Sequence, residues 1–134
     1  HPPKHRTKTT NRYFNYIYVR MGAHTLIHKR TEDDIWKNLF ELPLVETEKD
    51  LSEEEFLACP QFHALFAEGE VRMVRTLLRG VKHVLSHRVI YTNFYEVTLP
   101  DNSSSFSSYQ RVAVEDLGRY AVPRLIHAFL EKYV

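Results

Sequence analysis

Residues 81–97 read VKHVLSHRVIYTNFYEV, and this stretch decides the fold. Val, Ile, Tyr, Phe and Thr dominate it, which is typical of β-strands, and the pattern breaks at Ser86 and His87. Two β-rich runs around so short a polar break predict two strands joined by a tight turn. The polar side chains at the turn are candidates for metal binding, nucleophilic catalysis or DNA contact, or they belong to a plain solvated hairpin.

The chain before this hairpin predicts strands first and helices second. β-Formers fill residues 13–20, and after a turn near Gly22 the stretch 24–30 alternates as a strand does, so that these two segments predict a hairpin. Residues 33–46 predict a loop that leads into a short strand. Ser52 and the Glu three residues later form a capping box, which predicts a helix start, and Pro60 predicts a second one.

The chain after the hairpin completes the fold class. Residues 101–110 are polar and predict a loop, and QRVAV at 110–114 predicts one more strand. Pro123 opens an amphipathic stretch whose apolar side chains recur on one face, which predicts a helix of about three turns. Strands, helix, strands and helix in this order predict an α+β domain with helices packed on a mixed or antiparallel sheet.

Length and composition limit the class of protein. The chain has 134 residues, of which 43% are hydrophobic, and this suits one core and one domain. It contains neither the apolar run of about 20 residues that a membrane span needs nor a signal-peptide pattern, so we expect a soluble, cytoplasmic protein. Cys59 is its single cysteine, which excludes an internal disulfide or an iron–sulfur cluster built from this chain alone. Because the chain begins at His1 without a Met, we expect a piece of a longer or processed protein.

Charges are segregated along the chain although its net charge is only +1. Residues 1–31 hold seven Lys or Arg and no acid, residues 32–70 hold twelve acids against two bases, and residues 71–90 hold five bases and no acid. Two basic blocks around an acidic one suit a protein that turns one face to a polyanion. Residues 1–12 lack apolar periodicity and predict an extended basic arm or linker.

Catalytic and metal-binding interpretations of the turn fail on spacing. Neighbouring residues on an extended chain point to opposite sides, so His87 is poorly placed to activate Ser86. His83 and His87 would stand about 13 Å apart on a strand, too far for one zinc ion. The run Glu53–Glu55 lacks the spacing that holds Mg²⁺ against a diphosphate on one helix face. We therefore expect no catalysis by this chain.

A DNA-contacting turn fits the residues better than a metal site or a nucleophile. Basic side chains bracket the turn and would face phosphates: Arg72, Arg75, Arg79, Lys82 and Arg88. Ser86 and His87 can hydrogen-bond to base edges, and Leu85 can wedge against a base step. A plain structural hairpin remains the alternative on these residues alone.

Three sequence blocks, in order, carry a family resemblance. KHVLSH at 82–87 resembles the H-x-F-S-H loop in the C-terminal domain of MutY-type adenine DNA glycosylases, with Leu85 where Phe is common. DDIWKNLFELP at 33–43 is similar to the W-x-G-L-W-x-F-P stretch of that family, with Asn38 where Gly is frequent. VEDLGRYAVPRLIHAFL at 114–130 resembles its closing Y-A-x-P element. The resemblance runs from about Tyr13 to the C-terminus.

The resemblance implies a Nudix-like fold without a Nudix box, formed by residues 13–134. It implies that this domain recognises 8-oxoguanine paired with adenine in double-stranded DNA, during base-excision repair. In such proteins a separate N-terminal glycosylase domain, which carries an iron–sulfur cluster, flips and excises the adenine. This chain would then be non-catalytic and hold no cofactor itself, and residues 1–12 would be the end of the interdomain linker.

The resemblance also implies roles for individual residues. Ser86 would hydrogen-bond the Hoogsteen side of the oxidised base, and His87 would shape and orient the loop. Leu85 would wedge beside the lesion, and His83 would support the base of the loop. Cations would bind phosphates, both beside the loop and in the linker: Lys82, Arg88, Lys4, Arg6 and Lys8. The alternatives are a Nudix hydrolase of oxidised nucleotides and a protein-interaction module.

Overall fold

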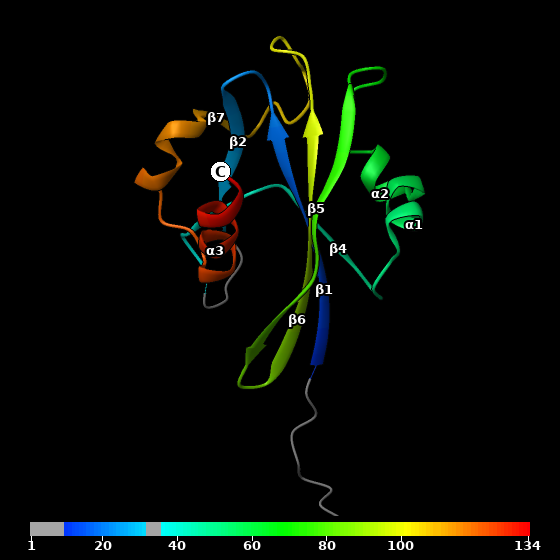
Figure 1. The fold of residues 1–134 in the computed structure, drawn as a ribbon, viewed down its shortest axis with the longest axis vertical. Coiled ribbons are helices and arrows are strands. Elements are labelled where there is room, and N and C mark those ends of the chain that lie inside the picture. Colours follow the sequence, from blue (N-terminus) through cyan, green and yellow to red (C-terminus); the bar gives the residue numbers. More distant parts are fainter. Residues whose placement is uncertain (1–9, 32–35) are drawn as a thin grey trace, which may run out of the picture.

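The computed structural model describes residues 10–31 and 36–134. In these ranges the chain forms seven strands, three α-helices and one 3-10 helix, arranged as an α+β domain (Figure 1). In chain order they are β1 (Thr10–Arg20), β2 (His24–Lys29), β3 (Phe40–Glu41), β4 (Leu44–Thr47), α1 (Glu53–Ala58), α2 (Pro60–His63), β5 (Met73–Leu85), β6 (Arg88–Thr98), β7 (Gln110–Ala113), η1 (Val114–Arg119) and α3 (Arg124–Tyr133). The predicted fold class is confirmed. None of these helices is long and apolar enough to cross a membrane.

A four-stranded mixed sheet in the order β4-β1-β6-β5 is the centre of the molecule. β1 runs parallel to β6, from Thr10 beside Arg88 upward. β5 and β6 form the antiparallel hairpin that the sequence predicts, closed by the pair Leu85 and Arg88. The first strand of this hairpin begins at Met73, well before the predicted start at Val81. Register shifts between Thr76 and Val81 explain the difference, because they break the alternation by which a strand is recognised in sequence.

The predicted hairpin between residues 13–20 and 24–30 is wrong. β2 pairs with β7 and β3 in a second, three-stranded sheet, and only an isolated bridge joins Met21 to His24. β6 occupies one edge of β1 along its whole length, and β4 occupies the other edge at Tyr13 to Tyr16. Gly22, with φ of 61°, lets the chain turn into the second sheet.

Two further boundaries differ from the prediction. β1 begins at Thr10, so that residues 10–12 belong to the sheet and not to the predicted arm. The segment 33–46, predicted as a loop and one short strand, contains β3 and most of β4 in its described part. Residues 1–9 of the arm lie outside the described residues.

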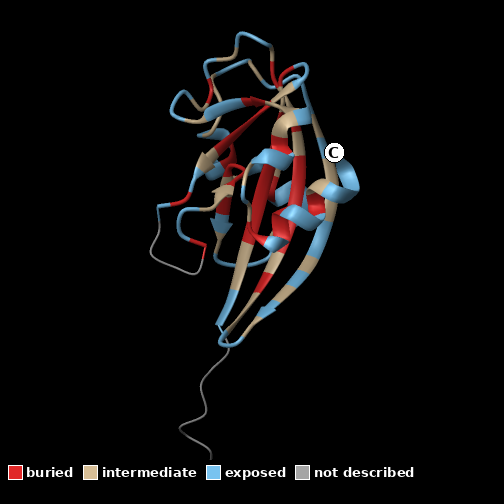
Figure 2. Ribbon diagram, turned by 90° about the vertical axis from the view of Figure 1, so that its left-hand side faces the viewer, coloured by how far each residue is buried: buried red, intermediate tan, exposed pale blue. Residues whose placement is uncertain are grey.

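Both faces of the central sheet are buried in its middle, as the red segments of Figure 2 show. All six residues of β1 from Phe14 to Val19 are buried, as expected of a strand covered on both sides. On one face Phe94 stacks on Phe129 of α3, with ring centroids 4.1 Å apart. On the other face Tyr95 stacks on Phe56 of α1 at 4.7 Å. Burial fades toward the hairpin end of the sheet, which lies at the bottom of Figures 1 and 2.

The helix starts follow their local sequence signals. Ser52 caps α1 in a capping box: its hydroxyl accepts from the Glu55 amide at 3.1 Å, and the Glu55 carboxylate accepts from the Ser52 amide at 2.9 Å. α2 begins at Pro60, a residue that suits the first turn. α3 follows Pro123 as predicted and buries its apolar stripe against the central sheet.

A buried ion pair ties the second sheet to the first. Arg30 donates to the Glu41 carboxylate at 2.7 Å, and both side chains are almost fully buried. The Tyr16 hydroxyl of β1 donates to the same carboxylate at 3.1 Å, and burial raises the Tyr16 pKa well above its ordinary value. The guanidinium of Arg30 also lies 5.6 Å from the ring centre of Trp36. Trp36 thereby lies on the same face of the central sheet as His83 of the β5–β6 hairpin.

Candidate nucleic-acid interface

The turn of the β5–β6 hairpin holds Ser86 and His87, both exposed. Neither residue has a positive φ; the non-glycine residues of the described chain that do are Asn38 and Phe106. The turn is therefore not one of the primed types that follow the twist of two strands most closely. The hydroxyl and the imidazole stand at an open tip, free of hydrogen bonds to any described side chain. We call residues 82–91 the hairpin end.

One face of the hairpin end, the first face, carries His83, Leu85 and Arg88. Leu85 and Arg88 are direct cross-strand partners, so their side chains share a face with His83, two residues away. The His83 ring lies 6.3 Å from the buried ring of Trp36, and Leu85 packs partly against the same core cluster. The structure thus places His83 at the base of the loop, as predicted. It places Leu85 partly against the core and not free at the tip.

The opposite face, the second face, carries Lys82, Val84, Val89 and Tyr91 of the hairpin together with Tyr13 of β1. Lys82 pairs with Tyr91 and Val84 with Val89 across the ladder. Tyr91 stacks on Tyr13 with ring centroids 5.6 Å apart, and Val84 is 65% exposed. Lys82 therefore lies on the other side of the sheet from His83 and Arg88.

The start of β1 lies directly beside the turn. The Thr10 amide donates to the His87 carbonyl at 3.1 Å, and Thr10 pairs with Arg88. The predicted linker contacts, Lys4, Arg6 and Lys8, lie outside the described residues. The described part of the chain nevertheless begins beside the Ser86-His87 turn, the loop predicted to contact DNA.

The prediction that five cations surround the tip is wrong for three of them. Arg75 lies near the far end of β5 and Arg72 directly precedes this strand; ten residues of strand, about 33 Å, separate Arg75 from Leu85. Arg79 donates to the Tyr95 hydroxyl at 2.5 Å and to the Leu51 carbonyl at 2.9 Å, beside α1. Residues that are close in sequence lie far apart in space when they are separated by an extended strand.

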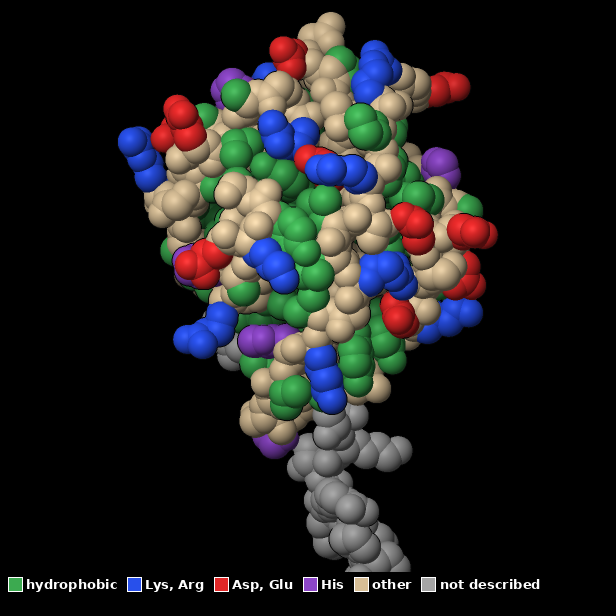
Figure 3. Space-filling model, viewed as in Figure 1, with side chains coloured by type: hydrophobic (Ala, Val, Ile, Leu, Met, Phe, Trp, Pro, Cys, Tyr) green, Lys and Arg blue, Asp and Glu red, His purple; other side chains and the backbone are tan. Residues whose placement is uncertain are grey.

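Ion pairing separates the cations of the sheet into two groups. Arg75 is held by Glu96 at 2.6 Å, Arg12 by Glu46 at 2.6 Å, and Arg79 lies 3.7 Å from Asp50. Lys82 and Arg88 make no ion pair with any residue in 10–31 or 36–134. In the view of Figure 3 the coloured side chains at the lower end of the molecule are basic, histidine, hydrophobic or uncharged, and none of them is a carboxylate. Lys82 and Arg88 thus offer positive charge that no described carboxylate pairs with.

Sequence reasoning missed three contributors to the hairpin end. Trp36 lies in the DDIWKNLFELP segment of the family resemblance, but no sequence pattern predicted that its ring would contact His83. Tyr13 and Tyr91 are 78 positions apart, and their contact depends on the parallel register of β1 and β6. A parallel neighbour has no sequence signal of its own, so that only the structure could bring these rings together.

The carboxylates of the acidic helix α1 do not converge on one point. Glu55 serves the capping box, and its hydrogen bonds with Ser52, first of all that from the backbone amide, lower its pKa. Glu53 accepts a hydrogen bond from the Thr76 hydroxyl. Among the described residues, no three His, Cys, Asp or Glu side chains lie close enough together to hold one metal ion.

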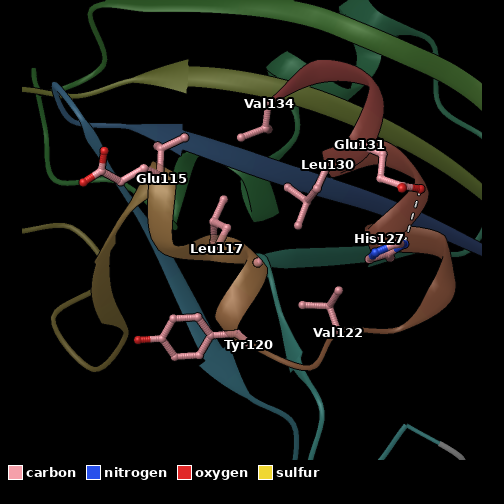
Figure 4. A pocket seen from close by; sticks show the side chains of 10 residues that line it. Glu115, Leu117, Tyr120, Val122, His127, Leu130, Glu131 and Val134 are labelled. Atoms are coloured by element: carbon pink, nitrogen blue, oxygen red, sulfur yellow. Dashed lines mark ion pairs between the residues drawn. The ribbon is translucent and has the colours of Figure 1, made fainter.

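A hollow of about 350 Å³ lies between η1 and α3 (Figure 4). Its walls are mainly apolar, with Leu117, Val122 and Leu130 facing it. His127 and Glu131 form an ion pair at 3.4 Å on one rim, while Glu115 stands on the opposite side. The ionisable groups do not converge on one point, so the hollow offers apolar surface and no set of acid and base groups.

Comparison with family models decides the family. The model of the NUDIX domain matches residues 15–132, nearly the whole chain. The chain belongs to the NUDIX domain family. None of the curated proteins compared with it matches its sequence. The Nudix-like fold implied by the sequence resemblance is thus confirmed.

Solved structures with this NUDIX fold include the C-terminal domain of a MUTYH protein and MutT proteins. The C-terminal domain of mouse MUTYH, solved in complex with human PCNA, superposes with a TM-score of 0.68 at 15% identity, over 91% of this chain and 86% of that one. A MutT from a study of Aliivibrio salmonicida and Vibrio cholerae reaches 0.63 at 16% identity, over 92% and 96%. The MutT protein of Methanosarcina mazei reaches 0.60 at 16% identity, over 95% of each chain.

Identities this low show a shared fold and leave the activity open. The NUDIX scaffold occurs here in a DNA-repair protein's C-terminal domain and in MutT proteins, and function has to be argued from the residues on the scaffold. In this chain those residues are the hairpin end on one side and the acidic helix α1 on the other.

Proposed function

We propose that this NUDIX domain recognises 8-oxoguanine opposite adenine in duplex DNA, as the lesion-reading part of an adenine DNA glycosylase in base-excision repair. The observation that carries the proposal is the exposed turn Ser86-His87, flanked by Lys82 and Arg88 with no carboxylate partner in the described chain. Unpaired cations bind phosphate without first breaking an ion pair. A hydroxyl and an imidazole between them can hydrogen-bond to base edges.

Each residue of the hairpin end has a part in the proposal. Ser86 hydrogen-bonds the oxidised base, and His87 orients the turn through its carbonyl, which accepts from the Thr10 amide. His83 supports the loop through its contact with Trp36. Leu85 stands in the wedge position of the resemblance, but a wedge has to leave the core contact that Leu85 makes here.

Excision chemistry belongs to another domain in this proposal. A glycosylase domain with an iron–sulfur cluster would flip and remove the adenine, and the arm cations Lys4, Arg6 and Lys8 would bind phosphates on the way to that domain. The support is positional, since the described chain starts at Thr10 beside the reading turn. The protein would act in the cytoplasm, and at the nucleoid if its source is a bacterium.

The test compares the chain with a Ser86→Ala, His87→Ala double variant on two duplexes. One duplex carries 8-oxoguanine:adenine and the other guanine:adenine, with binding followed by fluorescence anisotropy at low salt. We expect the preference for the oxidised duplex to shrink by about 1–3 kcal/mol, the value of a good base-edge contact. An equal preference in both proteins would refute the reading role of the turn.

A nucleotide hydrolase is the second candidate, because MutT proteins share the fold. Such an enzyme needs carboxylates that gather on Mg²⁺. Glu53 and Glu55 of α1 are instead engaged by Thr76 and Ser52, and the described residues do not fit a metal site of this kind. Mg²⁺-dependent release of pyrophosphate or phosphate from oxidised deoxyguanosine triphosphate by the purified chain would favour the hydrolase over the lesion reader.

A further inference from the structure

The two faces of the hairpin end each carry one cation without an ion-pair partner in the described chain. Arg88 lies on the first face with His83 and Leu85, and Lys82 lies on the second face opposite Tyr91. With the start of β1, which pairs with β6 from Arg88 onward, the hairpin end is a three-stranded end of the central sheet, with a cation on each face and the turn at its tip. The lesion-reading proposal uses Ser86, His87 and the charge of Lys82, but it leaves the tyrosine pair of the second face without a use.

The second face is open and polar at its edges. Tyr13 and Tyr91 stack with an angle of 16° between their planes, so each ring occupies a face of the other. Their hydroxyls make no hydrogen bond with any described residue. Lys82 is exposed beside them, and Val84 is 65% exposed toward the tip. The Lys82 ammonium and the hydroxyls of Tyr13 and Tyr91 therefore have no hydrogen-bond partner among the described residues. The tyrosine rings and Val84 form a small apolar surface beside them.

The acidic part of the molecule stops short of this face. Helix α1 covers the sheet at Tyr95, four residues beyond Tyr91, through Phe56. The next rung above the tyrosines is closed by Asn15 and Asn93, which are buried and bonded to each other at 3.0 Å. Asp50, the carboxylate beside Asn93, is held by Asn93 at 3.4 Å and lies 3.7 Å from Arg79. The charge of the second face thus complements an anion.

We propose that the second face binds the phosphodiester backbone of DNA through Lys82 and the hydroxyls of Tyr13 and Tyr91. The exposed ammonium of Lys82 attracts a phosphate, and the two tyrosine hydroxyls can donate hydrogen bonds to phosphate oxygens. Backbone contacts of this kind fix the register of a protein on the duplex, and here they would hold the turn at the bases that it reads. The inference rests on the proposed function in one respect, that the hairpin end enters DNA.

The experiment measures the salt dependence of DNA binding for Lys82→Gln. Each phosphate contact contributes about 0.9 to the slope of log Kd against log salt concentration, so we expect the slope to fall by about 0.9. Lys82→Arg keeps the charge and is expected to keep the slope. Arg75→Gln is the matched control, because Arg75 is a cation of the same strand that Glu96 already neutralises, and it should leave the slope unchanged.

The tyrosines need a separate variant. Tyr13→Phe with Tyr91→Phe keeps the ring stack and removes only the hydroxyls, and we expect DNA affinity to drop by roughly fivefold or more, the effect of one or two hydrogen bonds to a phosphate. A full slope for Lys82→Gln, or full affinity for the double Phe variant, would overturn the phosphate role of the second face. Circular dichroism and thermal unfolding of each variant check that the fold is intact.

Failure of this inference is distinguishable from failure of the lesion-reading proposal. If the slope falls for Lys82→Gln while Ser86→Ala, His87→Ala keeps its lesion preference, the second face binds DNA and the turn does not read the lesion. If the slope stays while the preference is lost, the turn reads the lesion and the second face faces something other than phosphate.

Discussion

At the scale of single residues, Glu70 joins two loops that are remote in sequence. Its carboxylate accepts hydrogen bonds from the hydroxyls of Ser103 at 2.5 Å and Ser105 at 2.7 Å, and from the amide of Ser104 at 3.1 Å. Ser105 in turn accepts from the Ala67 amide at 2.9 Å. These bonds, that from Ser103 first, lower the Glu70 pKa from 4.5 to about 2.

The Glu70 contacts predict a specific pH dependence of stability. A carboxyl whose pKa is lower in the folded state stabilises the fold above its unfolded pKa, and this stabilisation is lost as the pH falls through the folded pKa. Between about pH 5 and pH 2 the thermal midpoint of the chain should therefore fall more steeply than that of Glu70→Gln. Glu68→Gln, at an exposed glutamate two residues earlier, should follow the parent curve. Parallel curves for all three proteins would show that the contacts do not stabilise the fold.

The position of the polar turn could be predicted from the sequence, but the surroundings of its neighbouring side chains could not. Ser86 and His87 stand at an exposed turn as expected, because a polar break between two β-rich runs is a local signal. Leu85, the expected wedge, packs partly against the core, whereas its neighbour Val84 is exposed. Which neighbour points inward depends on strand register, and one step of register reverses the choice.

At the scale of elements, a bulge divides β5 into two halves. Arg79 and Gly80 fall outside the ladder with β6, between the pairs of Leu78 and Val81. Gly80 has φ of 71°, and its amide donates to the Asn93 side chain at 2.8 Å in place of a ladder bond. A bulge of this kind bends a strand and increases its twist. It thereby sets the direction in which the hairpin end leaves the sheet.

Gly80→Ala should destabilise the fold through its backbone alone. A Cβ at this position meets no atom within 4 Å, so the cost is that of an L-residue in the left-handed region, about 1–2 kcal/mol. Gly118→Ala is the matched control, since its Cβ also meets nothing within 4 Å and its φ is not positive. Urea unfolding measures both. Equal stabilities of the two variants would mean that the bulge relaxes without cost.

Elements could be predicted where their signals are local. The capping box, the helix start at Pro60, the last strand and α3 follow from short motifs in which neighbouring residues act on each other. The partner of β2 and the true start of β5 could not be predicted in this way. β2 leaves its sequence neighbour for β7, about 85 residues away, and the bulge hides the first half of β5 from any period-two pattern.

At the scale of the whole molecule, charges that are grouped along the sequence are not grouped in the same way in the folded structure. The basic block at 71–90 spreads along a strand of 13 residues, and its first cations are held by Glu96, Asp50 and backbone carbonyls. Two cations of the block, Lys82 and Arg88, have no ion-pair partner among the described residues, and they lie beside the point where β1 begins. Net charge per segment predicted a polyanion partner, and under our proposal this partner would meet the end of the sheet where these two cations lie.

The most direct test of the account is a map of the DNA-binding surface by NMR. Backbone amide shifts of the isotope-labelled chain would be followed during titration with a duplex that carries 8-oxoguanine:adenine. We predict that the largest changes fall on residues 82–91 and on Tyr13, with little change at α1 or in the hollow between η1 and α3. Changes confined to α1, or changes that appear only with Mg²⁺ and an oxidised nucleotide, would contradict it.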